Sequence, residues 1–216
     1  MKNRILKAVL SFSLAIVMLF TIMPIASAQS VENSDDIIAT VTLFCRPQKL
    51  IHGHGWIYVE NLSDSTLKVG HYDLPPGEGV SIGTFANSRE DGWGVYYNIE
   101  SYCAATYGLS GSTTLTEELT ASEFETLSKN IHDYLNTWNH LANCIFFAFS
   151  TWNSVSDKKF IPVLFPIFAK LQMKFYDCQT DTPEMMPVTA DRVYRQKNTG
   201  DQAYLVPVSE GSLGPM

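Results

Sequence analysis

Along the first half of the chain, apolar and polar positions follow the two-residue period of β-strands. In residues 54–60, for example, Trp56 and Tyr58 alternate with Ile57 and Val59. The segments NLSDS and PPGEG have the composition of turns between such runs. Residues 38–105 therefore predict an antiparallel meander. Its strand-like runs lie at residues 38–44, 54–60, 66–74, 80–85 and 92–102.

In the second half of the chain, the apolar positions follow the period of an α-helix instead. Thr120 and Glu123 have the spacing of a capping box, in which each side chain satisfies a free amide at a helix N-terminus. Apolar residues then recur on one helical face, and a second, almost wholly apolar helix is expected from Cys144 onward. Residues 160–176 are apolar but are interrupted by Pro162 and Pro166, and residues 179–216 predict a poorly ordered polar tail. Strands followed by helices indicate an α+β fold, with an antiparallel sheet packed on C-terminal helices.

The N-terminus has the pattern of a secretory signal peptide. Residues 2–7 carry three cations, residues 8–25 are apolar, and the stretch closes with Ala26-Ser27-Ala28. We therefore expect a signal peptide at residues 1–28, cleavage after Ala28, and a secreted or extracytoplasmic mature chain. A single domain would occupy residues 29–178. An uncleaved membrane anchor is the alternative, although a spanning helix usually needs about 20 apolar residues.

The charge balance limits the partners. Without residues 1–28 the chain has 12 Lys and Arg against 22 Asp and Glu, a net charge of −10. This charge argues against nucleic acid or anionic lipid as the main partner. After cleavage we expect no stable membrane insertion.

Four cysteines remain after the predicted cleavage, and their spacing matches no zinc-finger pattern. Export permits disulfides. If Cys144 is a free nucleophile, at most one bridge can form among the other three, and the sequence leaves their pairing open. They are Cys45, Cys103 and Cys178.

Cys144 is also the candidate catalytic residue. A thiol is a good nucleophile as thiolate, and a helix N-terminus favours that anion through its dipole and free amides. Asn143 is the expected N-cap. His54 opens a predicted strand and is the candidate base. If the next predicted strand forms a hairpin with it, His71 can lie beside His54 and orient the imidazole.

The segments GHGWIYVEN, VGHYDLPPG and NCIFFAFSTWN resemble the circularly permuted NlpC-type branch of the papain-like cysteine hydrolases. The resemblance covers about residues 45–175, and His54 precedes Cys144 as the permuted order requires. It implies a Cys–His–His triad of Cys144, His54 and His71 that cleaves an amide or ester bond without a cofactor. Cell-envelope peptides are the implied substrates, and acyl transfer is an alternative reaction. Ile145, which follows the cysteine, is larger than the residue that family members often have there.

Four other interpretations remain open. Cys144 can be a buried core cysteine, and His140 can be a rival base. His52, His54 and His71 can hold Zn²⁺ with an open fourth position. The chain can also be a non-catalytic exported binding module, in which case the Cys144 thiol would be inaccessible to reagents.

Overall fold

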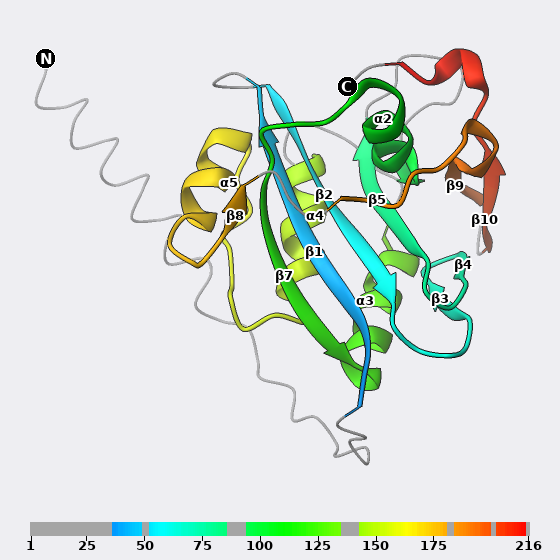
Figure 1. Cartoon of the computed structure of the whole chain (residues 1–216), viewed down its shortest axis with the longest axis horizontal. Helices are drawn as coiled ribbons and strands as arrows, with labels where there is room; N and C mark the ends of the chain where they lie inside the picture. Colours follow the sequence, from blue (N-terminus) through cyan, green and yellow to red (C-terminus); the bar gives the residue numbers. More distant parts are fainter. Residues whose placement is uncertain are drawn as a thin grey trace, which may run out of the picture. The chain divides into compact units, whose positions relative to one another are not determined.

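The structure is a computed structural model, which describes residues 36–48, 52–85, 94–134, 143–180, 184–199 and 202–214. The predicted signal peptide and His140 lie outside these residues. Residues 33–216 form one compact unit. The predicted α+β class is confirmed, since a large antiparallel sheet packs against helices (Figure 1).

The main sheet has eight strands in the order β10-β9-β6-β5-β2-β1-β7-β8, with every neighbouring pair antiparallel. A separate pair of short strands, β3 and β4, follows β2. The strands are β1 (Ile37–Pro47), β2 (Gly53–Asn61), β3 (Leu67–Val69), β4 (Tyr72–Leu74), β5 (Gly79–Phe85), β6 (Gly94–Tyr97), β7 (Thr113–Thr120), β8 (Gln179–Thr180), β9 (Tyr194–Thr199) and β10 (Gln202–Pro207).

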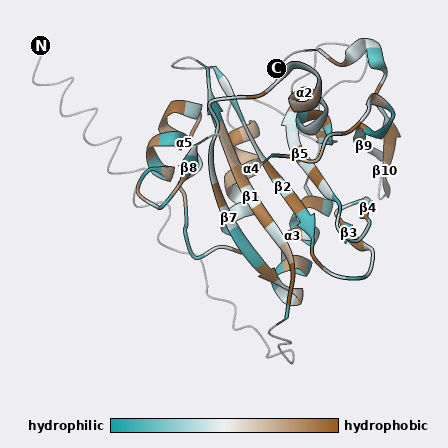
Figure 2. Ribbon diagram, in the orientation of Figure 1, coloured by the Kyte–Doolittle hydropathy of each residue, from teal (hydrophilic) through white to brown (hydrophobic). Residues whose placement is uncertain are grey.

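Side chains alternate between the two faces of the central strands, as the sequence period predicts. On one face, Leu43 and Ile57 join the core that also contains Phe147 of α4 and Met173 of α5. On the other face Trp56 stacks on Phe44, with ring centroids 4.7 Å apart. Figure 2 shows the hydrophobic positions of β1 and β2 at the centre of the fold. The described helices are α2 (Ile99–Tyr107), α3 (Ala121–His132), α4 (Cys144–Asn153) and α5 (Pro166–Met173).

The predicted helix starts are confirmed. The Thr120 hydroxyl accepts a hydrogen bond from the amide of Glu123, and the Glu123 carboxylate accepts one from the amide of Thr120, so the capping box forms. At the start of α4, the Asn143 side chain accepts a hydrogen bond of 3.1 Å from the Phe146 amide. Local chemistry therefore determines where both helices begin.

The structure differs from the sequence pattern in two places. Residues 99–107 form helix α2 instead of continuing a strand, because Asn98 adopts a left-handed conformation (φ 68°) that ends β6 and turns the chain. The expected polar tail contains three further strands, of which β8 pairs with β7 at the other edge of the sheet. Strand β9 pairs with β6 and β10 pairs with β9, so the segment after residue 179 extends the sheet. Its alternation was hidden by the many polar residues of an edge hairpin.

Two further findings concern the helices and the cysteines. No helix among the described residues is long and apolar enough to cross a bilayer. All four cysteines are free.

Candidate functional site

Cys144 is the first residue of α4, where the helix dipole favours an anion. The side chain is partly exposed. Its sulfur accepts hydrogen bonds from the backbone amides of Gly55 and Ile145, and it hydrogen-bonds the His54 imidazole. The neighbours of Cys144 are therefore donors that stabilise a thiolate.

His54 lies near the start of β2, and aromatic rings hold its imidazole in place. The ring stacks on Trp56 at a centroid distance of 5.4 Å and packs against Phe85 at 4.3 Å. Its Nε2 lies 2.9 Å from Oε1 of Glu100. Because Nε2 is occupied by the carboxylate, the other ring nitrogen, Nδ1, is the atom left for the Cys144 thiol.

Glu100 is the residue that the sequence interpretation missed. It lies in the first turn of α2, and its side chain is fully buried. The N-terminal end of a helix favours a carboxylate. One signal was present in the sequence, since Glu100 is the sole acidic residue between positions 92 and 116 and lies in an apolar, aromatic run. A buried carboxylate needs a partner, and here that partner is His54.

The three side chains shift each other's protonation. Burial alone would lower the pKa of His54, but the Cys144 thiolate and the Glu100 carboxylate outweigh it and raise that pKa to about 9. Burial would raise the pKa of Cys144, but the charge of His54, its hydrogen bond and the amides of Gly55 and Ile145 lower it. The arrangement therefore favours a thiolate–imidazolium pair near neutral pH.

Two of the other three thiols, Cys45 and Cys103, have a different environment. Cys45 and Cys103 are fully buried, and burial raises the pKa of each to about 12. Neither lies at the start of a helix. Reactivity toward thiol reagents should therefore distinguish Cys144 from these two residues.

Two glycines let the backbone approach the site closely. A Cβ atom at Gly55 would lie 2.5 Å from Cδ1 of Ile145, so the lack of a side chain lets α4 pack on β2. A Cβ atom at Gly83 would lie 2.0 Å from Oε1 of Glu100 and 3.0 Å from Nε2 of His54. Strand β5 therefore packs directly against the His54–Glu100 pair.

Replacing Gly83 with alanine should displace Glu100 from His54. We expect the pKa of His54, which Glu100 helps to raise to about 9, to fall by about one unit. The measurement is the NMR titration of the His54 ring in the folded variant, with folding verified by circular dichroism. Gly211→Ala is the matched control, because a Cβ atom there meets no other atom within 4 Å. An unchanged pKa of His54 in Gly83→Ala would contradict this account.

The structure brings Cys144 and His54 together but places His71 elsewhere. Strand β2 pairs with β5 instead of the β3–β4 pair, so the expected hairpin between the His54 and His71 strands is wrong. His71 follows β3, and its ring lies 4.2 Å from that of His132. Burial and the charge of His132 lower the pKa of His71. Glu100 occupies the position beside His54 that was predicted for His71.

The zinc arrangement of His52, His54 and His71 is not formed. His54 is engaged by Cys144 and Glu100, whereas His71 contacts His132. Within the part of the chain that the structure describes, no group of three or more His, Cys, Asp or Glu side chains could hold a metal ion. His132 is about half exposed on α3.

The Cys144–His54–Glu100 group can form a nucleophile, a base and an orienting carboxylate. Comparison of the chain with protein-family models, curated proteins and solved structures finds no match. The proposal for its function therefore rests on the geometry of this group.

Proposed function

We propose that the chain is an exported thiol hydrolase or acyltransferase that acts on amide or ester bonds. The contact of the Cys144 thiol with the His54 imidazole, which Glu100 hydrogen-bonds from the other side, is the observation that carries this proposal. A buried thiol, imidazole and carboxylate that shift each other's protonation are typical of an active site. No cofactor is implied.

The reaction begins with the proton of Cys144 already on His54. The Cys144 sulfur attacks the substrate carbonyl carbon and forms a tetrahedral oxyanion, to which the backbone amide of Cys144 at the start of α4 would donate. When the bond to the leaving nitrogen or oxygen breaks, the His54 imidazolium gives that atom its proton. The product is a thioester on Cys144 and a free amine or alcohol.

The second half of the reaction restores the enzyme. Neutral His54 takes a proton from water as the water oxygen attacks the thioester carbonyl, and the carboxylic acid leaves as the Cys144 thiolate returns. An alcohol or amine in place of water gives acyl transfer. Glu100 does not touch the substrate in this scheme. It holds His54 in position and stabilises the imidazolium that exists before attack and again after deacylation.

The permuted papain-like family is part of the proposal. His54 precedes Cys144 in the chain, the cysteine opens a buried helix, and the histidine lies on a strand of an antiparallel sheet. The third group departs from the residue first expected, since Glu100 replaces His71. Export also belongs to the proposal and rests on the sequence of residues 1–28. Together they suggest cell-envelope peptides or acyl groups as substrates.

The pH dependence of Cys144 alkylation tests the proposal. Iodoacetamide should alkylate Cys144 well below pH 8 in the wild type, because the thiolate is already formed there. In His54→Ala the positive charge that lowers the pKa of Cys144 is gone, and burial, which raises it, is left. The alkylation profile should therefore move to higher pH by at least one unit.

Cys45 and Cys103 serve as controls within the same molecule when peptide mass spectrometry locates the adducts. An ordinary thiol profile at Cys144, unchanged by His54→Ala, would refute the catalytic proposal. A Cys144 that iodoacetamide does not reach at any pH would favour a non-catalytic binding module. If hydrolysis is then found with a test ester or peptide, its rate should fall as the pH rises through about 9, where the His54 imidazolium loses its proton.

A further inference from the structure

The segment that contains α5 has a charge opposite to that of the rest of the chain. Residues 158–176 hold four lysines and no acidic residue, although the chain without residues 1–28 has a net charge of −10. The basic side chains are Lys158, Lys159, Lys170 and Lys174. Lys158 pairs with Glu117 at 2.7 Å, and Lys159 donates a hydrogen bond to the backbone oxygen of Asn153.

The same segment exposes an unusual amount of apolar surface. Helix α5 buries Pro166, Ala169 and Met173 against the sheet. Its outer side exposes Phe168, half exposed, and Phe175 just beyond the helix is 87% exposed. We define the α5 surface by its exposed apolar residues, which are Ile161, Leu164, Phe165, Phe168, Leu171 and Phe175. Figure 2 shows hydrophobic and hydrophilic positions side by side on α5.

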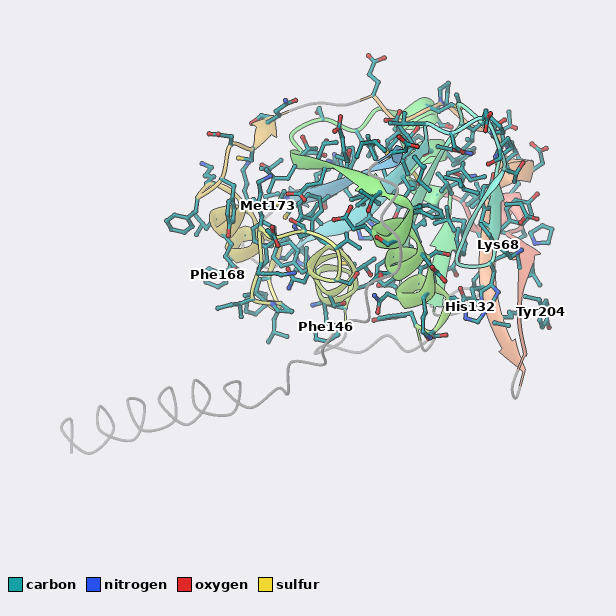
Figure 3. All side chains as sticks on the ribbon, turned by 90° about the horizontal axis from the view of Figure 1, so that it is seen from below. Lys68, His132, Phe146, Phe168, Met173 and Tyr204 are labelled. Atoms are coloured by element: carbon teal, nitrogen blue, oxygen red, sulfur yellow. The ribbon has the colours of Figure 1, made fainter. Side chains whose placement is uncertain are left out.

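The α5 surface borders the candidate site. The Asn143 side chain, which caps α4 beside Cys144, donates a hydrogen bond of 3.0 Å to the backbone oxygen of Leu164. A Cβ atom at Gly53, beside His54, would lie 3.0 Å from Cβ of Pro166. Phe146, two residues after Cys144, is also partly exposed. Figure 3 shows Phe146 and Phe168 projecting from α4 and α5, apart from His132.

We propose that the α5 surface docks the domain on an anionic lipid bilayer, so that Cys144 acts on carbonyl groups anchored in that bilayer. The substrate part of this inference rests on the proposed function. A short helix with an apolar outer face and flanking lysines lies in the plane of the membrane interface, where the apolar side chains enter the acyl region and the lysines contact anionic headgroups. Lys170 and Lys174 carry this second role, and the flanking Asp157 and Asp177 lie outside the basic segment.

Charge also argues against the main competitor, a second copy of the chain. In a two-fold symmetric dimer the same surface would face itself. The lysines of both copies would then approach one another with no acidic residue in the segment to pair with them. An anionic lipid surface attracts each of these lysines instead. The overall negative charge of the chain opposes non-specific adsorption and directs the domain to bind through the α5 surface.

The test is a sedimentation assay with vesicles on residues 33–216. These residues form a compact unit with its own core, so they can be studied without the predicted signal peptide. We expect binding to vesicles of phosphatidylglycerol mixed with phosphatidylcholine and at least about tenfold weaker binding to pure phosphatidylcholine. Phe168→Ser/Leu171→Ser and Lys170→Glu/Lys174→Glu should each lower the partition onto anionic vesicles by about tenfold or more.

Two control variants test whether the loss of vesicle binding is specific to the α5 surface. Leu62→Ser/Tyr204→Ser removes two apolar side chains that are similarly exposed, and Lys129→Glu/Lys197→Glu reverses two charges outside the α5 surface. Both should bind anionic vesicles like the wild type. No binding of the wild type, or equal binding by the α5-surface and control variants, would overturn the proposal. A third outcome would overturn the proposal in favour of a second copy of the chain. In it, the wild type forms a dimer and does not bind vesicles, and only Phe168→Ser/Leu171→Ser converts the dimer to monomers.

The alkylation of Cys144 at pH 6 separates this inference from the proposed function. The Phe168→Ser/Leu171→Ser variant should keep the alkylation rate of the wild type in solution, because neither residue contacts His54 or Glu100. If the wild-type protein has a reactive Cys144 but does not bind vesicles, the docking surface alone is therefore refuted. Vesicle binding by a protein with an unreactive Cys144 would refute the catalytic proposal and leave the docking surface standing.

Discussion

Replacing Glu100 with glutamine will lower the pKa of His54 by about one unit, and replacing it with alanine will lower it by about two units. The Glu100 carboxylate helps to raise the pKa of His54 to about 9, so its removal lowers the fraction of imidazolium between about pH 7 and pH 9 and leaves that fraction nearly unchanged at pH 6. The thiolate–imidazolium pair should therefore persist over a narrower pH range in both variants. The measurement is the titration of the His54 ring followed by NMR.

The two substitutions separate the charge of Glu100 from its geometry. Glutamine keeps the size of the side chain and can still accept a hydrogen bond from Nε2 of His54, whereas alanine removes both. Glu118→Gln controls for the loss of one negative charge, since Glu118 is exposed on β7. His71→Ala is the decisive comparison. It should leave the pKa of His54 unchanged, and a large fall of that pKa in His71→Ala with none in Glu100→Gln would reverse the assignment.

Replacing Trp152 with alanine will lower the free energy of unfolding by about 3–5 kcal/mol, the range for deleting a large buried aromatic side chain. Trp152 is fully buried near the end of α4 and packs against Phe160. Its Nε1 also donates a hydrogen bond of 2.8 Å to the backbone oxygen of Lys158. The substitution leaves a cavity beside Phe160 and removes the donor that pairs with the backbone oxygen of Lys158.

Urea unfolding followed by circular dichroism measures this effect. Phe175→Ala is the matched control, because Phe175 is 87% exposed and its truncation should change the free energy of unfolding by less than about 0.5 kcal/mol. A loss below about 1 kcal/mol in Trp152→Ala would mean that α4 does not depend on this contact. Because α4 carries Cys144, a strongly destabilised variant should also lose the alkylation of Cys144 at low pH as α4 detaches.

The docking proposal changes how the charge of the chain is understood. The net charge of −10 argued against anionic lipid as a partner when it was taken as a single number for the whole chain. The structure places Lys170 and Lys174 together with the exposed Phe168 and Phe175 on α5 and its C-terminal flank, near the candidate site. Binding depends on the local charge within about a Debye length, which is near 10 Å at moderate salt, so the local surface outweighs the total.

Much of the local structure was determined by the sequence alone. The alternation of residues 54–60 predicts β2, Thr120 and Glu123 predict the start of α3, and Asn143 predicts the start of α4 at Cys144. These features depend on side chains a few residues apart, and their chemistry acts at that range. The sequence also singled out Cys144 and His54, which the structure places in contact.

Tertiary structure alone decided which residue completes the site. Glu100 is 46 positions from His54 in the chain, and the two meet because β2 pairs with β5, on which α2 packs. Several pairings are compatible with the same alternating pattern, so local period does not select between β5 and the strand before His71. Tertiary packing also decides which side of α5 is exposed. An apolar sequence does not reveal which of its faces the sheet covers, because that depends on long-range packing.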